Sequence, residues 1–468
     1  RQYNRLKNFI EGMIVLFERN TRFMANQDKY LTVAVETHGC KLNQADSLIL
    51  SREFQAAGFD VVPTSSPCDV YVVNTCSVTH VADRKGRHSA RAAKRRNPHS
   101  KVIVTGCYAE RDMETIEAIE EVDLVFGNTS KTQIVKTVAK ALHLEGIPIE
   151  SFPDFHLSDY SWRNRAMLKI QEGCNQICAY CIVPYVRGRE RSVPIGEILE
   201  SIFRFEREGF REVVLTGTQL GSYGFDLQDT TLIDLISSVL KCTEIPRIRL
   251  SSLQPQEIDL KLLGLWKDSR LCPHFHIPLQ SGSDAVLKRM RRKYSAADFS
   301  KAVDMVRDQV QDASITSDII VGFPGETRED YQKTLSLCEE AGFSDVHVFK
   351  FSPRPGTSAN HLLDDVPAHE KSERSSVLIE AGKKSFSEFR RKCHEKTMKV
   401  LWEPETPGSH RGQLITGLTP NYIRVQSPAG SVVEPLSDVA LRFDFEDPYG
   451  DMGIFSEHSL SEMSSPIC

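Results

Sequence analysis

Residues 167–181 read Met-Leu-Lys-Ile-Gln-Glu-Gly-Cys-Asn-Gln-Ile-Cys-Ala-Tyr-Cys, a strand pattern that runs directly into three cysteines. Three thiolates this close together, Cys174, Cys178 and Cys181, can surround one compact inorganic core. The next cysteine is Cys242, so a fourth ligand is absent at short range, and structural zinc usually takes four protein ligands. Three thiolates on a [4Fe–4S] cube instead leave one iron open. The alternatives are an incomplete zinc site or a redox pair of Cys178 and Cys181.

The strand before these cysteines is the first of six that alternate with helical patterns over residues 167–395. Six βα units can form a partial (βα)6 barrel or an open sheet. The cysteines favour the barrel, because such folds carry their chemistry at the C-terminal ends of the strands. The predicted strands are Met167–Gln171, Glu212–Thr216, Arg247–Ser251, His274–Leu279, Ser314–Val321 and Asp345–Phe351.

Residues 31–145 show the same alternation, which predicts a doubly wound parallel α/β domain. Three of its strand patterns are each followed by a polar or glycine turn and then a cysteine, namely Cys40, Cys76 and Cys107. The carboxyl ends of parallel strands converge on one crevice, so we expect these thiols to hold a second cluster. The alternative is three buried core cysteines, because free cysteine is often part of a core.

The remaining segments differ in composition. Residues 146–166 carry prolines and many polar side chains and are expected to be a linker. Residues 396–443 contain short strands joined by Gly, Pro and Ser turns, which predicts a small all-β barrel. We expect a poorly ordered leader over residues 1–30 and a disordered, serine-rich tail over residues 444–468.

Charge and hydropathy exclude several classes of protein. The 468 residues include 58 Lys and Arg against 63 Asp and Glu, a net charge of −5, so any site for a polyanion must be local. No apolar run is long enough to span a bilayer. Residues 83–101 contain eight Lys or Arg against one Asp, and residues 288–293 contain five cations. A solvated face is the alternative for each patch. The residues predicted to contact the phosphates of a nucleic acid are Arg84, Lys85, Arg87, Arg91, Arg187, Arg191 and Arg292.

Residues 167–181 resemble the cysteine signature of the radical S-adenosylmethionine (SAM) enzymes. Over residues 31–443 the order of motifs resembles the methylthiotransferase family, most closely its MtaB type. That family has an N-terminal domain with three dispersed cysteines, a radical SAM barrel and a small TRAM barrel that binds RNA. The stretches that carry the resemblance are Thr-His-Gly-Cys-Lys-Leu-Asn-Gln at 37–44, Asn-Thr-Cys-Ser-Val-Thr at 74–79, Ala-Asp-Arg-Lys-Gly-Arg at 82–87, Val-Leu-Lys-Arg-Met-Arg-Arg at 286–292 and Phe-Ser-Pro-Arg-Pro-Gly-Thr at 351–357.

The resemblance implies a set of cofactors and the residues that bind them. Cys174, Cys178 and Cys181 would hold the [4Fe–4S] cluster that cleaves SAM, and Cys40, Cys76 and Cys107 a second [4Fe–4S] cluster involved in sulfur transfer. The resemblance implies that all six cysteines bind metal and take part in catalysis. The SAM contacts would follow successive barrel strands, at Gly217, Thr218, Gln219, Ser252, Gln280, Asp318 and Gly322.

The implied activity is methylthiolation of carbon 2 of N6-threonylcarbamoyladenosine at position 37 of tRNA, with two SAM molecules. This carbon carries an unactivated C–H bond. Acid–base chemistry cannot remove its hydrogen at neutral pH, whereas a radical cofactor can. The expected partners are the anticodon stem-loop and an electron donor such as flavodoxin or ferredoxin, in the cytoplasm and without a membrane. The alternatives are MiaB-type modification of isopentenyladenosine, RimO-type modification of a ribosomal-protein aspartate, and a non-catalytic iron–sulfur or zinc RNA-binding protein.

Overall fold

The computed structural model describes residues 31–141, 164–403, 414–428 and 434–443. The predicted leader, the predicted tail and nearly all of the predicted linker lie outside the described residues. By their internal contacts the described residues form two compact units. The first contains residues 31–141 with the short segments 173–175 and 181–189. The second contains residues 164–172, 176–180 and 190–443, apart from the gaps above.

The first unit is built on a five-stranded parallel sheet in the order β2-β1-β3-β4-β5. Its central strand β3 is buried on both faces, as its apolar run Val-Tyr-Val-Val requires. The order reverses between β1 and β3, which makes that pair the topological switch point. The strands are β1 (Thr32–Thr37), β2 (Asp60–Val61), β3 (Val70–Thr75), β4 (Lys101–Gly106) and β5 (Leu124–Phe126).

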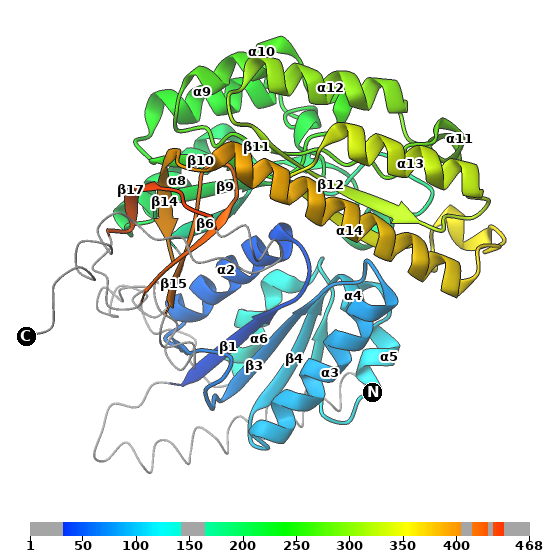
Figure 1. The fold of residues 1–468 in the computed structure, drawn as a ribbon. Coiled ribbons are helices and arrows are strands. Elements are labelled where there is room, and N and C mark those ends of the chain that lie inside the picture. Colours follow the sequence, from blue (N-terminus) through cyan, green and yellow to red (C-terminus); the bar gives the residue numbers. More distant parts are fainter. Residues whose placement is uncertain (1–30, 142–163, 404–413, 429–433, 444–468) are drawn as a thin grey trace, which may run out of the picture. The chain divides into compact units, whose positions relative to one another are not determined.

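Helices cover both faces of this sheet, because side chains of a strand alternate between its faces. Val70 and Val72 pack with α2 and α6 in one core, whereas Tyr71 and Val73 pack with α3, α4 and α5 in another (Figure 1). The predicted doubly wound α/β fold is therefore confirmed. The helices are α2 (Lys41–Ala56), α3 (His80–Arg96), α4 (Cys107–Arg111), α5 (Met113–Glu117), η1 (Lys131–Gln133) and α6 (Ile134–Ala141), together with α7 (Val183–Arg187) from the later segment.

The second unit contains the six predicted βα strands, all parallel and in chain order. They form two three-stranded sheets. Two isolated β-bridges, from Ile248 to Leu271 and from Ser252 to His276, connect these sheets. The strands are β6 (Arg165–Lys169), β9 (Glu212–Thr216), β10 (Arg247–Leu250), β11 (His274–His276), β12 (Ser314–Val321) and β13 (Asp345–Lys350). A short antiparallel pair, β7 (Gln171–Glu172) and β8 (Arg191–Ser192), lies on either side of the cysteine segment in sequence.

Helices cover the outside of these strands. Figure 1 shows α9, α12 and α13 along one side of them, and α14 packs against β13 and α13. Thr231, Ser295 and Thr327 each begin a helix with a capping box, which fixes where the chain leaves each loop. The helices are α8 (Ile195–Arg207), η4 (Leu220–Ser222), α9 (Leu232–Cys242), η5 (Pro255–Glu257), α10 (Leu260–Leu263), η6 (Gly264–Lys267), α11 (Asp284–Arg289), α12 (Ala296–Gln309), α13 (Arg328–Ala341), η7 (Ser358–His361) and α14 (Ala368–Cys393).

The predicted small β domain is a four-stranded antiparallel sheet in the order β16-β15-β14-β17. Val400, Trp402, Val425 and Val439 form its core. Parts of the predicted barrel fall at residues 404–413 and 429–433, outside the described residues, so its closure stays a prediction. The strands are β14 (Thr397–Trp402), β15 (Leu414–Leu418), β16 (Arg424–Pro428) and β17 (Leu436–Ala440).

A buried ionic network attaches this sheet to the parallel strands. The Glu212 carboxylate at the start of β9 is fully buried and pairs with Arg165, Arg247 and Arg249 at 3.0, 2.7 and 2.9 Å. Arg247 also donates to the carbonyl oxygens of Leu418 (2.9 Å) and Thr419 (3.0 Å). These contacts explain why the small sheet belongs to the same compact unit as the parallel strands.

Candidate active site

Three cysteines of the first unit follow three neighbouring parallel strands. Cys40 lies at the N-cap of α2 just after β1, Cys76 directly follows β3, and Cys107 is the first residue of α4 after β4. Cys40 and Cys76 thus lie at the switch point of the sheet, where open α/β folds bind their ligands. The strand topology predicted from the sequence brings these thiols to one edge.

Packing and electrostatics show that these thiols are neighbours. Gly39 has φ +92°, and a Cβ there would lie 2.5 Å from Cys76 Cβ and 2.7 Å from its Sγ, so only glycine fits. Removal from water raises the pKa of the Cys40 thiol even though the residue as a whole is exposed, and the Cys107 thiolate raises it further. Burial raises the pKa of Cys76 to about 12, with smaller contributions from Cys40 and Cys107.

Arg187 supplies the positive charge beside this set. Its side chain is 2% exposed, its Nη2 lies 3.1 Å from Asp46 Oδ2, and it also donates to Asn43 Oδ1. Its charge lowers the pKa of Cys40, opposing burial. Arg187 is a predicted RNA contact, and this stays a prediction. In the structure its guanidinium neutralises the buried carboxylate of Asp46, whose unpaired charge would destabilise the fold.

The same segment, residues 181–189, covers Cys107. Ile182 and Val186 form a small apolar cluster with Cys107. The amide of Asn128 donates to Val186 O at 2.8 Å and approaches Cys107 Sγ at 3.6 Å. The segment that follows the first cysteine set therefore belongs structurally to the surroundings of the second set.

The cysteine set Cys174, Cys178 and Cys181 lies in the segment between β7 and β8. Gly173 has φ +80°, and a Cβ there would clash with Arg189 O at 2.0 Å. The backbone N–H of Cys174 donates to Gly188 O at 3.1 Å. Cys174 is buried and the other two are half-buried. Cys174 and Cys181 group with the first compact unit and Cys178 with the second, so only their closeness in sequence relates all three.

The donor chemistry of both sets suits an iron–sulfur cube better than one ion. Zn–S bonds of about 2.3 Å would hold tetrahedral ligand sulfurs about 3.8 Å apart. Within the described residues, the three sulfur atoms of neither cysteine set all lie within 4.8 Å of one another. A cube needs no such closeness, because each thiolate binds a different iron.

Arg292 lies beside the first cysteine set. Its Nη1 is 3.2 Å from Cys178 Sγ, its Nη2 is 3.1 Å from Gln254 Oε1, and its guanidinium stacks on the ring of Tyr294. The cation run at 288–293 predicts that Arg292 contacts RNA, and this stays a prediction. In the structure its half-buried guanidinium contacts a thiol of the predicted cluster and an amide oxygen, because a charge removed from water needs polar partners.

The predicted SAM contacts after β9 are held by Gln171. Its Oε1 accepts from the backbone N–H of Thr218 (2.8 Å) and of Gln219 (3.0 Å). A Cβ at Gly217 would lie 2.9 Å from the same oxygen. The hydroxyls of Thr218 and of Ser251, at the ends of β9 and β10, are buried and have no hydrogen-bond partner among the described residues. Unsatisfied buried hydroxyls fit a polar ligand at these strand ends. Ser251 ends a predicted strand beside the predicted contact Ser252, whereas Gln171 is not among the predicted site residues.

The other predicted SAM residues shape the strand ends through their backbones. Ser252 bridges to His276. Gln280 has φ +66°, and its N–H donates to Asp318 O at 2.8 Å. Gly322 has φ +69°, and its N–H donates to Glu326 Oε2 at 2.6 Å. Strained backbone at strand ends is typical of ligand sites.

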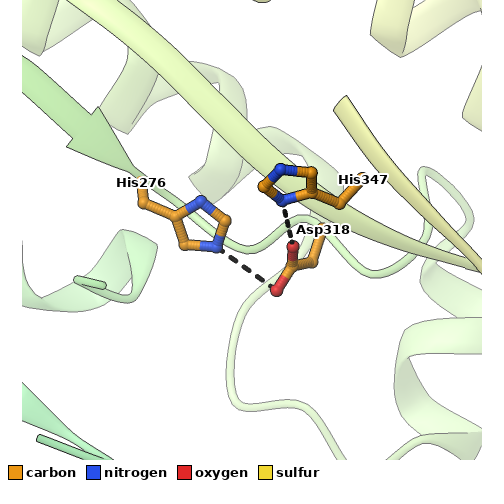
Figure 2. A group of neighbouring side chains, drawn as sticks. All are labelled: His276, Asp318 and His347. Atoms are coloured by element: carbon orange, nitrogen blue, oxygen red, sulfur yellow. Dashed lines mark hydrogen bonds and ion pairs between the residues drawn. The ribbon is translucent and has the colours of Figure 1, made fainter. Parts of the chain in front are cut away.

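Asp318 lies between two imidazoles (Figure 2). Its Oδ2 is 3.3 Å from His276 Nε2 and its Oδ1 is 3.1 Å from His347 Nδ1. Burial alone would raise the pKa of Asp318, but the two rings outweigh it and hold that pKa well below its usual range. Hydrogen bonds to Asp318 and Asp345 raise the pKa of His347 to about 10. His347 lies on a predicted strand but is not among the predicted site residues.

The remaining predicted RNA residues fall into two groups. Arg84, Lys85 and Arg91 on α3 and Arg191 on β8 are exposed. Arg87 is partly buried, and it donates to the Tyr108 hydroxyl at 2.6 Å. Part of the basic charge of α3 therefore fastens the helix to its own sheet.

A succession of parallel βα units with three clustered cysteines after its first strand defines the class of radical SAM enzymes. Residues 168–338 match the radical SAM superfamily, and residues 32–127 match the uncharacterized protein family UPF0004. The fold is similar to that of the radical SAM methyltransferase TsrM from Kitasatospora setae, with TM-score 0.50 and 12% identity over 69% of this chain and 73% of that one.

Related proteins of known activity match most of the chain. The threonylcarbamoyladenosine tRNA methylthiotransferase MtaB of Aquifex aeolicus is 38% identical over 79% of this chain and 92% of its own. That of Bacillus subtilis is 35% identical over 84% and 90%. The tRNA-2-methylthio-N6-dimethylallyladenosine synthase of Clostridium tetani is 31% identical over 89% and 95%. The chain belongs to the radical SAM methylthiotransferases of the MtaB type.

Membership makes the chain an enzyme whose cofactors are SAM and [4Fe–4S] clusters. Within the described parts of the chain, no helix combines the length and the apolar character that crossing a bilayer requires.

Proposed function

We propose that this enzyme methylthiolates carbon 2 of N6-threonylcarbamoyladenosine at position 37 of tRNA. The observation that carries the proposal is the pair of three-cysteine sets, one gathered at the C-terminal edge of the first sheet and one in the segment between β7 and β8. MtaB relatives named for this reaction match at 35–38% identity over most of the chain, which supports this substrate.

The six cysteines would divide the chemistry. Cys174, Cys178 and Cys181 would bind the cluster that works with SAM, and Cys40, Cys76 and Cys107 the cluster that takes part in sulfur transfer. When bound, SAM and these clusters supply the radical that removes the carbon 2 hydrogen, and the sulfur and methyl groups that replace it. Each set has one arginine beside a cysteine, Arg187 at Cys40 and Arg292 at Cys178. A fixed positive charge stabilises thiolate ligands.

The polar groups at the strand ends would bind SAM. The unpartnered hydroxyls of Thr218 and Ser251 are available to the polar groups of SAM. Gln171 holds the turn at 217–219 through two backbone N–H groups. Six of the seven predicted cofactor contacts are kept, namely Gly217, Thr218, Gln219, Ser252, Gln280 and Gly322, and Ser251 joins them. The seventh, Asp318, pairs with His276 and His347 in the structure.

The tRNA would bind by its phosphates and by an exposed base. Arg84, Lys85 and Arg91 form an exposed basic stripe on α3, and Arg191 adds a further exposed cation. Tyr185 is 59% exposed and offers a stacking surface to an unpaired base. An anticodon loop presents such a base without the cost of opening a duplex. The small antiparallel sheet would add a second RNA contact. We further propose a flavodoxin- or ferredoxin-type electron donor and a cytoplasmic location.

Mass spectrometry of tRNA nucleosides tests the proposal. In a strain that lacks this chain we expect threonylcarbamoyladenosine to lose its 2-methylthio group, while isopentenyladenosine keeps its own. The wild-type chain should restore the modification, and a Cys174→Ala variant should not. The opposite pattern, in which only isopentenyladenosine loses the group, would assign the chain to the other substrate.

A further inference from the structure

Two histidines and one aspartate gather on three neighbouring strands of the second unit, apart from both cysteine sets in sequence. His276 on β11 pairs with Thr316 on β12, and Asp318 pairs with His347 on β13. Since Thr316 and Asp318 are two residues apart, their side chains lie on one face of the sheet. One donor atom from each of His276, Asp318 and His347 lies within 4.8 Å of the other two (Figure 2).

Each ring also has a partner at its other nitrogen. His276 Nδ1 lies 2.9 Å from Thr316 Oγ1, so its Nε2 is the atom that faces Asp318. His347 Nε2 lies 3.5 Å from Asp345 Oδ2, so its Nδ1 faces Asp318. Metal-binding histidines typically have this arrangement, in which the second nitrogen contacts a hydroxyl, carbonyl or carboxylate that fixes the orientation of the ring.

We propose that His276 Nε2, His347 Nδ1 and the Asp318 carboxylate bind one divalent first-row transition metal ion, of which Zn²⁺ is the representative. Two imidazole nitrogens and one carboxylate oxygen suit such an ion. The protons that now join Asp318 to the rings leave to solvent when N–metal and O–metal bonds replace the hydrogen bonds. Three protein ligands leave at least one coordination position for a further oxygen or nitrogen donor.

Burial and charge at the site agree with this assignment. The His276 side chain is 11% exposed and anchors the site, while that of His347 is 54% exposed and gives an ion access from solvent. Asp318 binds the ion directly, and Asp345 adds a second negative charge behind His347. With both rings neutral, the two carboxylates balance the charge of a divalent ion. The methylthiolation proposed above requires no such ion, so this site goes beyond that function.

Zinc binding to the enzyme with its clusters assembled tests the site. The protein is reconstituted anaerobically with iron and sulfide, titrated with Zn²⁺ against a chromogenic chelator, desalted, and analysed for iron and zinc. We expect one zinc per chain without loss of iron. His276→Gln and His347→Gln should each weaken binding about tenfold or more, and Asp345→Asn about tenfold. His369→Gln, which changes an exposed histidine on α14, is the matched control and should bind like wild type.

X-ray absorption at the zinc edge identifies the ligands. Nitrogen and oxygen neighbours at about 2.0–2.2 Å support the site, whereas sulfur at about 2.3 Å would place the zinc on cysteines and overturn it. Binding that is equal in wild type and in the double variant of His276 and His347 would also overturn it, as would the absence of bound zinc. Circular dichroism of each variant establishes that it is folded, so that lost binding reports the lost ligand.

Discussion

Arg187 and Arg191 are four residues apart, yet their charges have different roles. Arg187 is buried against Asp46 and Asn43, whereas Arg191 is exposed on β8. Removing one partner of a buried ion pair leaves the other charge uncompensated. At an exposed position the same substitution removes only a charge that can reach a phosphate.

We predict that Arg187→Ala lowers the free energy of unfolding by about 3 kcal/mol, because the buried Asp46 carboxylate loses a cationic partner. Arg191→Ala should leave stability unchanged within about 0.5 kcal/mol. It should instead reduce the salt dependence of tRNA binding by about one phosphate contact. Urea unfolding and filter binding over a range of salt concentrations measure the two effects. Equal stability of the two variants would contradict the burial of Arg187.

Charge counting along the sequence could not separate these two arginines. It identified cation-rich segments correctly, but a partner such as Asp46 lies 141 residues away and emerges only on folding. The contacts of Arg292 with Cys178 and Gln254 could not be predicted for the same reason, because these residues meet only in three dimensions. The strand-end cysteines were predictable, since parallel strands must end at one edge whatever their separation in sequence.

At the scale of elements, β9 begins with a carboxylate that joins two sheets. Glu212 pairs with Arg165, Arg247 and Arg249, and Arg247 also holds the loop after β15. Burial alone would raise the pKa of Glu212, but the three arginines outweigh burial and depress it well below its usual range. The predicted strand pattern gave no sign of this network, because the residues Glu-Val-Val-Leu-Thr at 212–216 look like an ordinary buried strand.

We predict that Glu212→Gln destabilises the chain by about 3 kcal/mol at pH 7, because the buried guanidiniums of Arg247 and Arg249 and the partly buried one of Arg165 lose their carboxylate. A carboxyl with a depressed folded-state pKa contributes stability above its unfolded pKa and loses that contribution as the pH falls towards the folded value. The gap between variant and wild type should therefore be constant at neutral pH and shrink below about pH 4.3. Urea unfolding across pH measures it. Glu200→Gln, at an exposed position on α8, should show no gap at any pH.

Helix α3 carries more basic side chains than its packing against the sheet requires. Lys94 pairs with Asp123 at 3.2 Å and Arg87 with the Tyr108 hydroxyl, whereas Arg84, Lys85 and Arg91 are exposed. Replacing these three with Gln should reduce the slope of log affinity for tRNA against log salt by about 2 to 3, because each lost phosphate contact contributes about 0.7 to 0.9. The same change at Lys301, Lys383 and Lys384 removes three charges from α12 and α14 and should leave the slope unchanged. A slope unaffected by the α3 changes would move the RNA site elsewhere.

At the scale of the whole molecule, two three-cysteine sets occur in one chain, and each should support one part of the reaction. If each binds its own cube, replacing either set with Ala should halve an iron content of about eight per chain.

The two losses should nevertheless differ in effect. Without Cys174, Cys178 and Cys181 the enzyme should no longer cleave SAM under reducing conditions. Without Cys40, Cys76 and Cys107 it should still cleave SAM and form no methylthio group. Chromatography of the SAM products and nucleoside mass spectrometry separate the two activities in one reaction. Replacing Cys242 and Cys272, which belong to neither set, should change neither iron content nor activity. If both triple variants lost SAM cleavage alike, the two clusters could not have separate roles.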